Sequence, residues 1–212
     1  MIHTYCERQG VGLFAEPLNT LTNLAFVWAA VAAWNLAGRC KVRAWDLNLL
    51  TALAAAIGVG SGLWHMFATP WAKLLDLVPI FLFQLCFLWM YLRSCAGRSA
   101  AVATLVACGY FVVSLLMMWL PPYLNGSILY APTFVVLLCA AVYHYTTQQP
   151  ERYLLGIGAG LFCVGLTCRS IDWVVCGYVP CGTHFLWHAF GGGLLYVALR
   201  SLIMDRSVAI GS

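Results

Sequence analysis

Residues 183–193 read T-H-F-L-W-H-A-F-G-G-G and open an apolar segment that continues to Met204. This segment is long enough to cross a bilayer, because a membrane helix needs about 20 apolar residues. His184 and His188 stand four residues apart near its start, so on a helix both imidazoles lie on one face. An ionisable side chain inside a membrane segment is costly and indicates a functional site. From this segment alone, two interfacial or hydrogen-bonded histidines are the alternative.

The composition of the whole chain predicts an integral membrane protein. Of its 212 residues, 63% are hydrophobic and only 8% are charged, and the mean hydropathy is +0.86. A soluble domain has about a quarter charged residues. The net charge of +4 is small and its basic residues are spread among loops, which argues against a nucleic-acid partner.

Seven apolar segments predict an all-α membrane protein with one seven-helix transmembrane domain over residues 1–212. The spans are expected at about 18–37, 46–67, 76–93, 101–120, 128–146, 154–171 and 183–204. The connections between them are short, which suits neighbouring helices that run up and down.

Lys and Arg residues predict the orientation of the bundle. Three of the eleven fall on the side of the N-terminus, namely Arg8, Lys73 and Arg169. The other eight fall on the side of the C-terminus: Arg39, Lys41, Arg43, Arg93, Arg98, Arg152, Arg200 and Arg206. Positively charged loops stay in the cytoplasm, so the N-terminus is expected outside and the C-terminus in the cytoplasm. The short loops, with no obvious retention signal, favour a bacterial inner membrane with this outer side in the periplasm.

This topology brings five polar residues to the outer end of the bundle. The second span runs outwards and places Ser61 and His65 near its outer end. The third and seventh spans begin at the outer face, with Asp76 on one and His184 and His188 on the other. A miscount by one span would send these side chains to opposite faces. We therefore predict one site at the outer face.

Three neutral imidazoles that leave a fourth position for water form the open tetrahedral arrangement of a catalytic zinc site. Zinc lowers the pKa of bound water to about 7 and polarises a substrate carbonyl. Asp76 is predicted to take the water proton and return it to the leaving group. Ser61, one turn from His65, is predicted to donate a hydrogen bond to the developing oxyanion.

Each of these residues also has a plainer interpretation. His65 can make a helix–helix hydrogen bond, Ser61 can be a small packing residue, and Asp76 can cap the start of its helix. A catalytic pair with Ser61 as nucleophile and His65 as base is a further alternative. It accounts for neither the second histidine pair nor the extra acid.

Two carboxylates suggest a second site. Glu7 and Glu16 flank a short glycine-containing loop before the first span. Outward-facing oxygen ligands suit a hard cation such as calcium. Solvated loop carboxylates are the alternative.

Four stretches together resemble the alkaline ceramidase family. They are Y-C-E at 5–7, A-E-P-L-N-T-L-T-N-L at 15–24, G-V-G-S-G-L-W-H-M-F-A-T-P-W-A-K-L-L-D-L-V-P-I at 58–80 and G-T-H-F-L-W-H at 182–188. The family belongs to a superfamily of seven-span metal hydrolases that also contains the adiponectin receptors. The resemblance covers nearly the whole chain in segment order.

The resemblance implies that His65, His184 and His188 hold zinc, that Ser61 stabilises the oxyanion and that Asp76 transfers protons. It implies hydrolysis of the amide of a ceramide-like lipid to a fatty acid and a sphingoid base. The rivals are a zinc hydrolase of other acyl lipids and a non-catalytic seven-span receptor with structural zinc. A transporter is disfavoured, because its site would lie at the midplane.

The resemblance also implies two features of the N-terminal segment. Calcium-dependent members of the family suggest Glu7 and Glu16 as calcium ligands, with the Tyr5 carbonyl and Gln9. A disulfide is implied between Cys6 and Cys176, with Cys181 free or in competition for the bond. Two unpaired thiols are the alternative, since pairing cannot be deduced from sequence.

Overall fold

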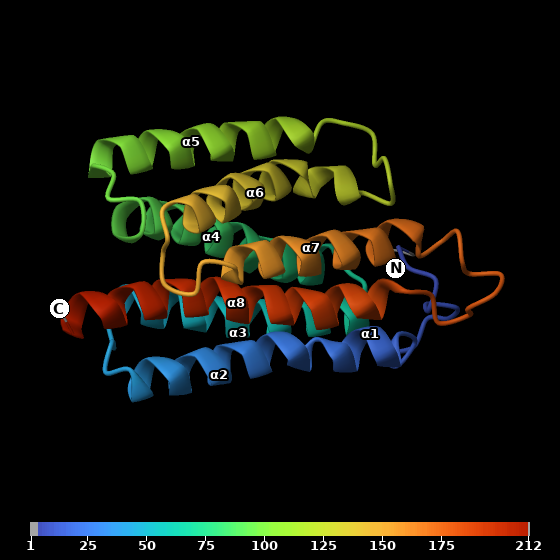
Figure 1. Ribbon diagram of the computed structural model, residues 1–212. Coiled ribbons are helices and arrows are strands. Elements are labelled where there is room, and N and C mark those ends of the chain that lie inside the picture. Colours follow the sequence, from blue (N-terminus) through green and yellow to red (C-terminus); the bar gives the residue numbers. More distant parts are fainter. Residues whose placement is uncertain (1–3, 212) are drawn as a thin grey trace.

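The computed structural model describes residues 4–211, and the regular structure in that range is helical. The helices run side by side along one axis, and the two ends of the chain lie at opposite ends of the bundle (Figure 1). In chain order they are α1 (Pro17–Thr22), α2 (Leu24–Arg39), α3 (Trp45–Phe67), α4 (Pro70–Ser94), α5 (Ala100–Met117), the 3-10 turn η1 (Ser127–Tyr130), α6 (Ala131–Thr146), α7 (Leu154–Ile171) and α8 (His184–Gly211).

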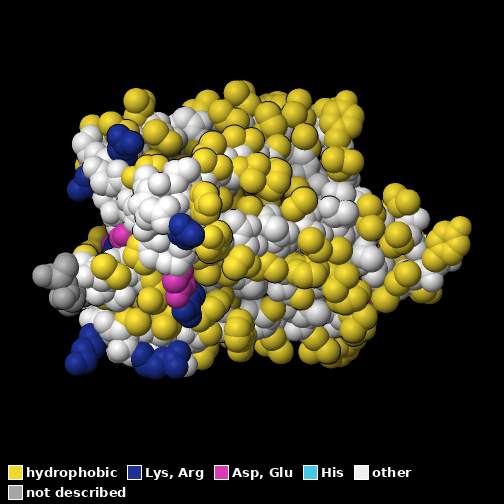
Figure 2. Space-filling model, viewed as in Figure 1, with side chains coloured by type: hydrophobic (Ala, Val, Ile, Leu, Met, Phe, Trp, Pro, Cys, Tyr) yellow, Lys and Arg dark blue, Asp and Glu magenta, His cyan; other side chains and the backbone are white. Residues whose placement is uncertain are grey.

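Within the described range, seven helical segments are long and apolar enough to cross a membrane, as the sequence predicts. α1 and α2 together make the first segment, and η1 with α6 makes the fifth. Apolar side chains cover most of the visible surface between the two ends of the bundle (Figure 2). Soluble monomers rarely expose apolar surface on this scale. The protein is therefore a multi-pass integral membrane protein.

The first span, expected as one helix over 18–37, is divided at Asn23. The Asn23 side-chain amide donates to the Asn19 backbone carbonyl at 2.6 Å, and the Asn23 backbone carbonyl accepts from the Phe26 amide at 3.1 Å. These local hydrogen bonds offer the backbone an alternative to the regular helical ladder. The short α1 thereby becomes an element of its own.

The third span begins at Pro70, six residues before the predicted start at 76. Ala68 has a left-handed φ of 47° and ends α3, and the extended Thr69 precedes Pro70 in the first turn of α4. Proline is favoured there because its fixed φ suits the helix and its missing N–H is not needed. Asp76 consequently lies in the second turn, so the alternative that it caps its helix is wrong. Other boundaries agree within three residues, except that α8 continues to Gly211.

α8 is the central helix, in contact with α1, α2, α3, α4 and α7. Its Leu199, Leu202 and Ile203 are almost completely buried. Gly192 sets the spacing to α2, because a Cβ atom at this position would lie only 2.7 Å from the carbonyl oxygen of Ala25. Small residues allow membrane helices to approach this closely. The close contact brings the first span next to the histidine-bearing end of α8.

Residues 4–16, which we call the N-terminal strap, fold over one end of the bundle (Figure 1). A disulfide joins Cys6 to Cys176 in the loop between α7 and α8, with the Cα atoms 5.7 Å apart. This is the pair that the family resemblance implies, and Cys181 is a free thiol. The strap and the loop that precedes α8 are therefore one connected structure.

Candidate metal centre

Three histidines from two helices meet beneath the strap. The last turn of α3 supplies His65, and the start of α8 supplies His184 and His188. All three are at most 2% exposed, and their candidate ligand nitrogens lie within 4.8 Å of one another. The Nε2 atoms of His65 and His188 are 3.2 Å apart. Ligands of tetrahedral zinc, at Zn–N distances of about 2.0–2.1 Å, are separated by about 3.3 Å. The arrangement suits such an ion after a small inward movement of the more distant nitrogen.

Two of the imidazoles are oriented by side chains of the first span and the strap. Nδ1 of His65 lies 2.5 Å from Oε2 of Glu16, and Nδ1 of His188 lies 2.9 Å from Oγ1 of Thr22. A histidine that binds a metal typically uses its other ring nitrogen for such a contact. The contact sets the tautomer and leaves the remaining nitrogen for the metal. Both Nε2 atoms therefore face the centre of the cluster.

His184 is held by its backbone and by stacking. The Tyr5 ring lies parallel to the imidazole with 3.6 Å between ring centres. Nδ1 of His184 is buried and has no hydrogen-bond partner among the described residues. A buried polar atom without a partner is costly. Coordination to a metal would account for a His184 imidazole that is buried without a hydrogen-bond partner for Nδ1. The residues present therefore fit the ion that the sequence predicts.

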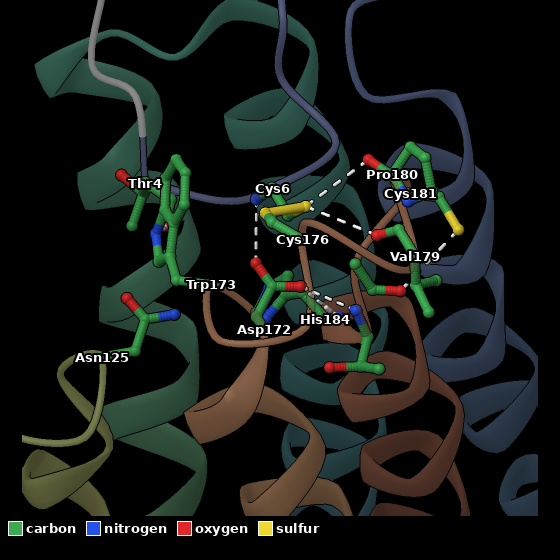
Figure 3. Close-up of a disulfide and its surroundings, with 12 residues drawn as sticks. Thr4, Cys6, Asn125, Asp172, Trp173, Cys176, Val179, Pro180, Cys181 and His184 are labelled. Carbon is green, nitrogen blue, oxygen red and sulfur yellow. Dashed lines mark hydrogen bonds between the residues drawn. A yellow bond between two sulfur atoms is a disulfide. The ribbon is translucent and has the colours of Figure 1, made fainter.

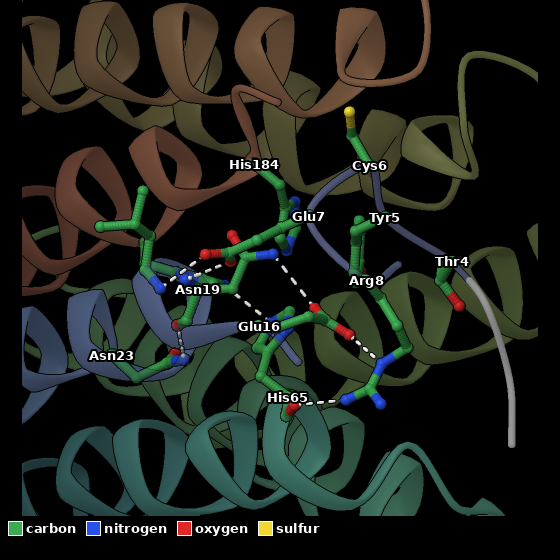
Figure 4. A network of polar contacts seen from close by, with 12 residues as sticks. Thr4, Tyr5, Cys6, Glu7, Arg8, Glu16, Asn19, Asn23, His65 and His184 are labelled. Atoms are coloured by element: carbon green, nitrogen blue, oxygen red, sulfur yellow. Dashed lines mark hydrogen bonds and ion pairs between the residues drawn. The ribbon is translucent and has the colours of Figure 1, made fainter. Parts of the chain in front are cut away.

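Glu16 is the hub of a buried polar network (Figure 4). Its carboxylate accepts hydrogen bonds from Nε of Arg8 and, at 3.1 Å, from Nδ2 of Asn19. Arg8 also donates to the backbone carbonyl of His65 at 2.6 Å. Burial raises the pKa of Glu16, but hydrogen bonds from His65, Arg8 and Asn19 outweigh it and hold the pKa below its usual value. Glu16 is thus an ionised acceptor for His65, a role that its assignment to calcium in the sequence analysis missed.

The other predicted calcium ligands have separate roles within residues 4–211. The Glu7 carboxylate accepts hydrogen bonds from the backbone amides of Leu18 at 2.7 Å and Asn19 at 2.8 Å, at the start of α1. Burial raises the pKa of Glu7, and these two hydrogen bonds oppose the change. Gln9 is exposed. Calcium binding stays a prediction.

Ser61 and Asp76 meet across the α3–α4 contact. Ser61 is 4% exposed and lies one turn before His65. Its side chain is within hydrogen-bonding reach of Asp76. Gly60 makes this contact possible, because a Cβ atom there would lie 1.9 Å from the carbonyl oxygen of Leu75. The two helix backbones therefore touch where the serine and the aspartate face each other.

Asp172 is a positioning residue that the sequence analysis did not identify. It follows α7 and is completely buried. Its carboxylate accepts hydrogen bonds from the backbone amides of Thr183 at 2.7 Å, His184 at 2.9 Å and Cys6 at 2.9 Å (Figure 3). It therefore caps the start of α8 and ties the strap to it. The one signal in the sequence was an aspartate directly after the sixth span, which is also typical of solvated loops.

An apolar cavity lies within the bundle next to the metal centre, and the three histidines are not part of its lining. Trp187 and Gly191, on either side of His188 in the sequence, lie at one end of its lining on α8, and Ala198 lies at the other. These positions span about 16 Å at 1.5 Å per helical residue. The remaining walls are mostly aromatic and aliphatic, with Phe83 and Phe87 of α4 as examples. The cavity can accept a hydrocarbon chain.

Comparison with known families gives one finding of nearly full length. Residues 3–209 match the family model described as Ceramidase. The matched range contains the three histidines together with Ser61 and Asp76. A search of curated proteins finds no match.

Proposed function

Because the chain belongs to the ceramidase family, we propose that it is a zinc-dependent intramembrane amide hydrolase. The proposed substrate is a ceramide-like lipid, which is cleaved to a fatty acid and a sphingoid base. The observation that carries the proposal is the meeting of three buried histidines next to an apolar cavity, whose lining residue Phe26 contacts the His188 ring. A receptor with structural zinc would not need such a cavity next to its metal ligands.

The proposed roles follow from the contacts of each residue. His65, His184 and His188 would hold zinc, which supplies a Lewis acid for an amide carbonyl and lowers the pKa of water to about 7. Asp76 accepts the proton of the attacking water and returns it to the amine leaving group. Ser61, whose side chain is within hydrogen-bonding reach of Asp76, donates to the carbonyl oxygen as negative charge develops on it.

The lipid would enter with its polar end near the strap and one hydrocarbon chain in the cavity. Phe26, which lines the cavity, makes an edge-on contact with the His188 ring, with 6.1 Å between ring centres. A chain in the cavity would therefore pass beside the histidine cluster. This arrangement holds the amide of the lipid at the histidines and excludes bulk water from the chain.

Two further observations support an outward-facing centre. In Figure 2, Lys and Arg side chains gather at the end of the bundle that holds the C-terminus, which agrees with a cytoplasmic location for that end. The Cys6–Cys176 disulfide lies at the opposite end, and disulfides persist in oxidising compartments. We propose that the strap faces the periplasm of a bacterial inner membrane.

The direct experiment combines metal analysis of the purified protein with release of fatty acid from a defined ceramide. We expect bound zinc and turnover in the parent protein, and loss of both in His184→Ala and His188→Ala. His144→Ala is a matched control, because this buried histidine of α6 contacts Tyr91 outside the cluster. It should retain zinc.

A substrate panel separates the rivals. Faster cleavage of N-acyl amino lipids or phospholipids than of ceramide would reassign the substrate. Bound zinc without turnover on any lipid would support a structural metal and contradict the proposed activity.

Calcium is tested separately. If Glu7 and Glu16 bind calcium, added calcium should raise the melting temperature of the purified protein and a calcium-selective chelator should lower it. A melting temperature that responds to neither would leave the strap without calcium.

A further inference from the structure

A cation beside the metal centre is buried without an ion pair to any carboxylate of residues 4–211. Arg169, in the last turn of α7, is 8% exposed. The carboxylates that form ion pairs within residues 4–211 are held by other groups, and no Asp or Glu oxygen there lies within 4.0 Å of an Arg169 nitrogen. Buried charges in proteins are normally paired, and those inside membrane segments usually serve a function. Arg169 therefore requires an explanation that packing does not supply.

The contacts of Arg169 stabilise its charge without neutralising it. Nη1 donates to the hydroxyl oxygen of Tyr5 at 2.8 Å. The guanidinium carbon lies 5.6 Å from the ring centres of both Tyr5 and Tyr130, within the range of cation–π attraction. Nε is buried and has no hydrogen-bond partner among the described residues. At least one strong donor is thus left for a ligand.

The position of Arg169 places this donor near the site of the proposed reaction. Tyr5 separates the guanidinium from the metal centre, because its ring stacks directly on His184. Tyr130, the second aromatic partner, lines the apolar cavity. Arg169 consequently contacts both a ring that stacks on the histidine cluster and a ring that lines the space we assign to the hydrocarbon chain.

The proposed reaction creates an anion at this place. Hydrolysis breaks the amide C–N bond and forms a C–O bond with water, giving a carboxylate and a protonated amine. The carboxylate carbon is the carbon that was attacked, so this group is formed at the histidine cluster. Guanidinium groups bind carboxylates through charge-assisted N–H donors.

We propose that Arg169 binds a carboxylate beside the metal centre. This inference rests on the proposed function for its main ligand, the carboxylate of the released fatty acid. A carboxylate in the headgroup of an N-acyl amino acid substrate has the same chemistry and is the second source. In both cases Arg169 is a binding residue that acts on an anion close to the reacting carbon.

The first test measures binding without catalysis. The melting temperature of the zinc-loaded protein is recorded with a long-chain fatty acid and with the primary alcohol of equal length. We expect the acid to stabilise the parent protein more than the alcohol does, and Arg169→Gln to lose this difference. Arg169→Lys should keep part of it, since the charge remains. Arg152→Gln is the matched control, because this partly exposed arginine donates hydrogen bonds to Gln148 and Tyr153 away from the centre.

The second test distinguishes the two sources of carboxylate. If the product is the ligand, inhibition of ceramide hydrolysis by the fatty acid should weaken roughly 10- to 100-fold in Arg169→Gln, the effect of losing a charge-assisted hydrogen bond. If a headgroup is the ligand, kcat/KM for an N-acyl amino acid should fall by a similar factor and inhibition by the fatty acid should not change.

Two outcomes would overturn the proposal. One is a folded Arg169→Gln protein that still prefers the acid to the alcohol as strongly as the parent does. The other is loss of that preference in Tyr5→Phe. This variant keeps the Arg169 charge and removes only the hydroxyl that accepts its hydrogen bond, so such a loss would show that Arg169 acts through packing and not by binding the acid. A parent protein that binds the acid through Arg169 but hydrolyses no ceramide would refute the proposed function alone.

Discussion

At the residue scale, the metal centre depends on the contacts that hold each imidazole in place. Glu16 holds His65 and Thr22 holds His188, while His184 is placed by Tyr5 and its backbone. A carboxylate on the distal nitrogen increases the basicity of a histidine ligand and restricts its ring. Glu16 is therefore expected to act on metal affinity although it would not touch the metal.

Glu16→Gln should weaken zinc binding by about 10- to 100-fold, the usual effect of removing such a partner. The measurement is a titration of the purified protein against a zinc chelator of known affinity. Glu7→Gln is the matched control, because Glu7 contacts backbone amides of α1 instead of a histidine. An equal loss of affinity in both variants would show that the strap as a whole, and not the Glu16–His65 contact, controls zinc.

Asp76→Asn should keep zinc and lose turnover, because an amide cannot accept a proton from water and return it to the amine. Zinc content and fatty acid release are measured on the same preparation. Asp46→Asn, at the other end of the bundle, removes a carboxylate that is paired with Arg206 at 2.6 Å and should leave both readouts near those of the parent. Retained hydrolysis in Asp76→Asn would remove this aspartate from the mechanism.

At the element scale, the centre is assembled by close contacts between helices. α3 touches α4 at Gly60, and α8 touches α2 at Gly192, in both cases with no room for a Cβ atom. The break at Asn23 turns α1 into a separate element whose Thr22 contacts His188. The two helices that carry the metal-centre histidines, α3 and α8, are thus each fixed against a partner helix near the site.

Gly60→Ala should lower both the thermal stability and kcat. Alanine normally stabilises a helix relative to glycine by about 0.5–1 kcal/mol. At Gly60 the added Cβ would lie 1.9 Å from a backbone oxygen of Leu75, so α4 and Asp76 must move. Overpacking of this kind costs about 1–3 kcal/mol.

Gly62→Ala provides the control on the same helix. No atom lies within 4 Å of the Cβ position at Gly62, so this variant should be at least as stable as the parent and equally active. Equal melting temperatures and kcat values for the two variants would contradict the claim that Gly60 positions Asp76.

At the scale of the whole molecule, the strap unites three parts of the chain. Cys6 is bonded to Cys176, its amide donates to Asp172, and the neighbouring Tyr5 packs on His184. Arg8 and Glu16 continue the same layer to His65. One end of the bundle is therefore closed by a segment that contacts both helices of the metal centre, α3 and α8.

Cys6→Ser should destabilise the protein by about 2–5 kcal/mol, the typical cost of losing a native disulfide. It should also weaken zinc binding, because Tyr5 and Arg8 flank the lost bond. Melting temperature and zinc affinity are measured with and without reductant, and Cys176→Ser should behave in the same way. Cys108→Ser, which removes an exposed free thiol of α5, is the control. Unchanged stability in Cys6→Ser would show that hydrogen bonds alone hold the strap.

The sequence by itself determined the seven apolar spans, their order and the depth at which His65, His184 and His188 stand. Hydropathy and helical spacing are local properties of the sequence. Together with the number of spans, they place the three histidines at the same end of the bundle. The tertiary structure alone decided that Glu16 faces His65, that Asp172 caps α8 and that Arg169 is buried with no ion pair to a carboxylate of the described residues. Glu16 and His65 are 49 residues apart in the chain, and Asp172 is 166 residues from Cys6. A carboxylate or guanidinium has the same sequence signature whether water or a buried partner receives it. Only the packing of the strap and helices determines which of the two it meets.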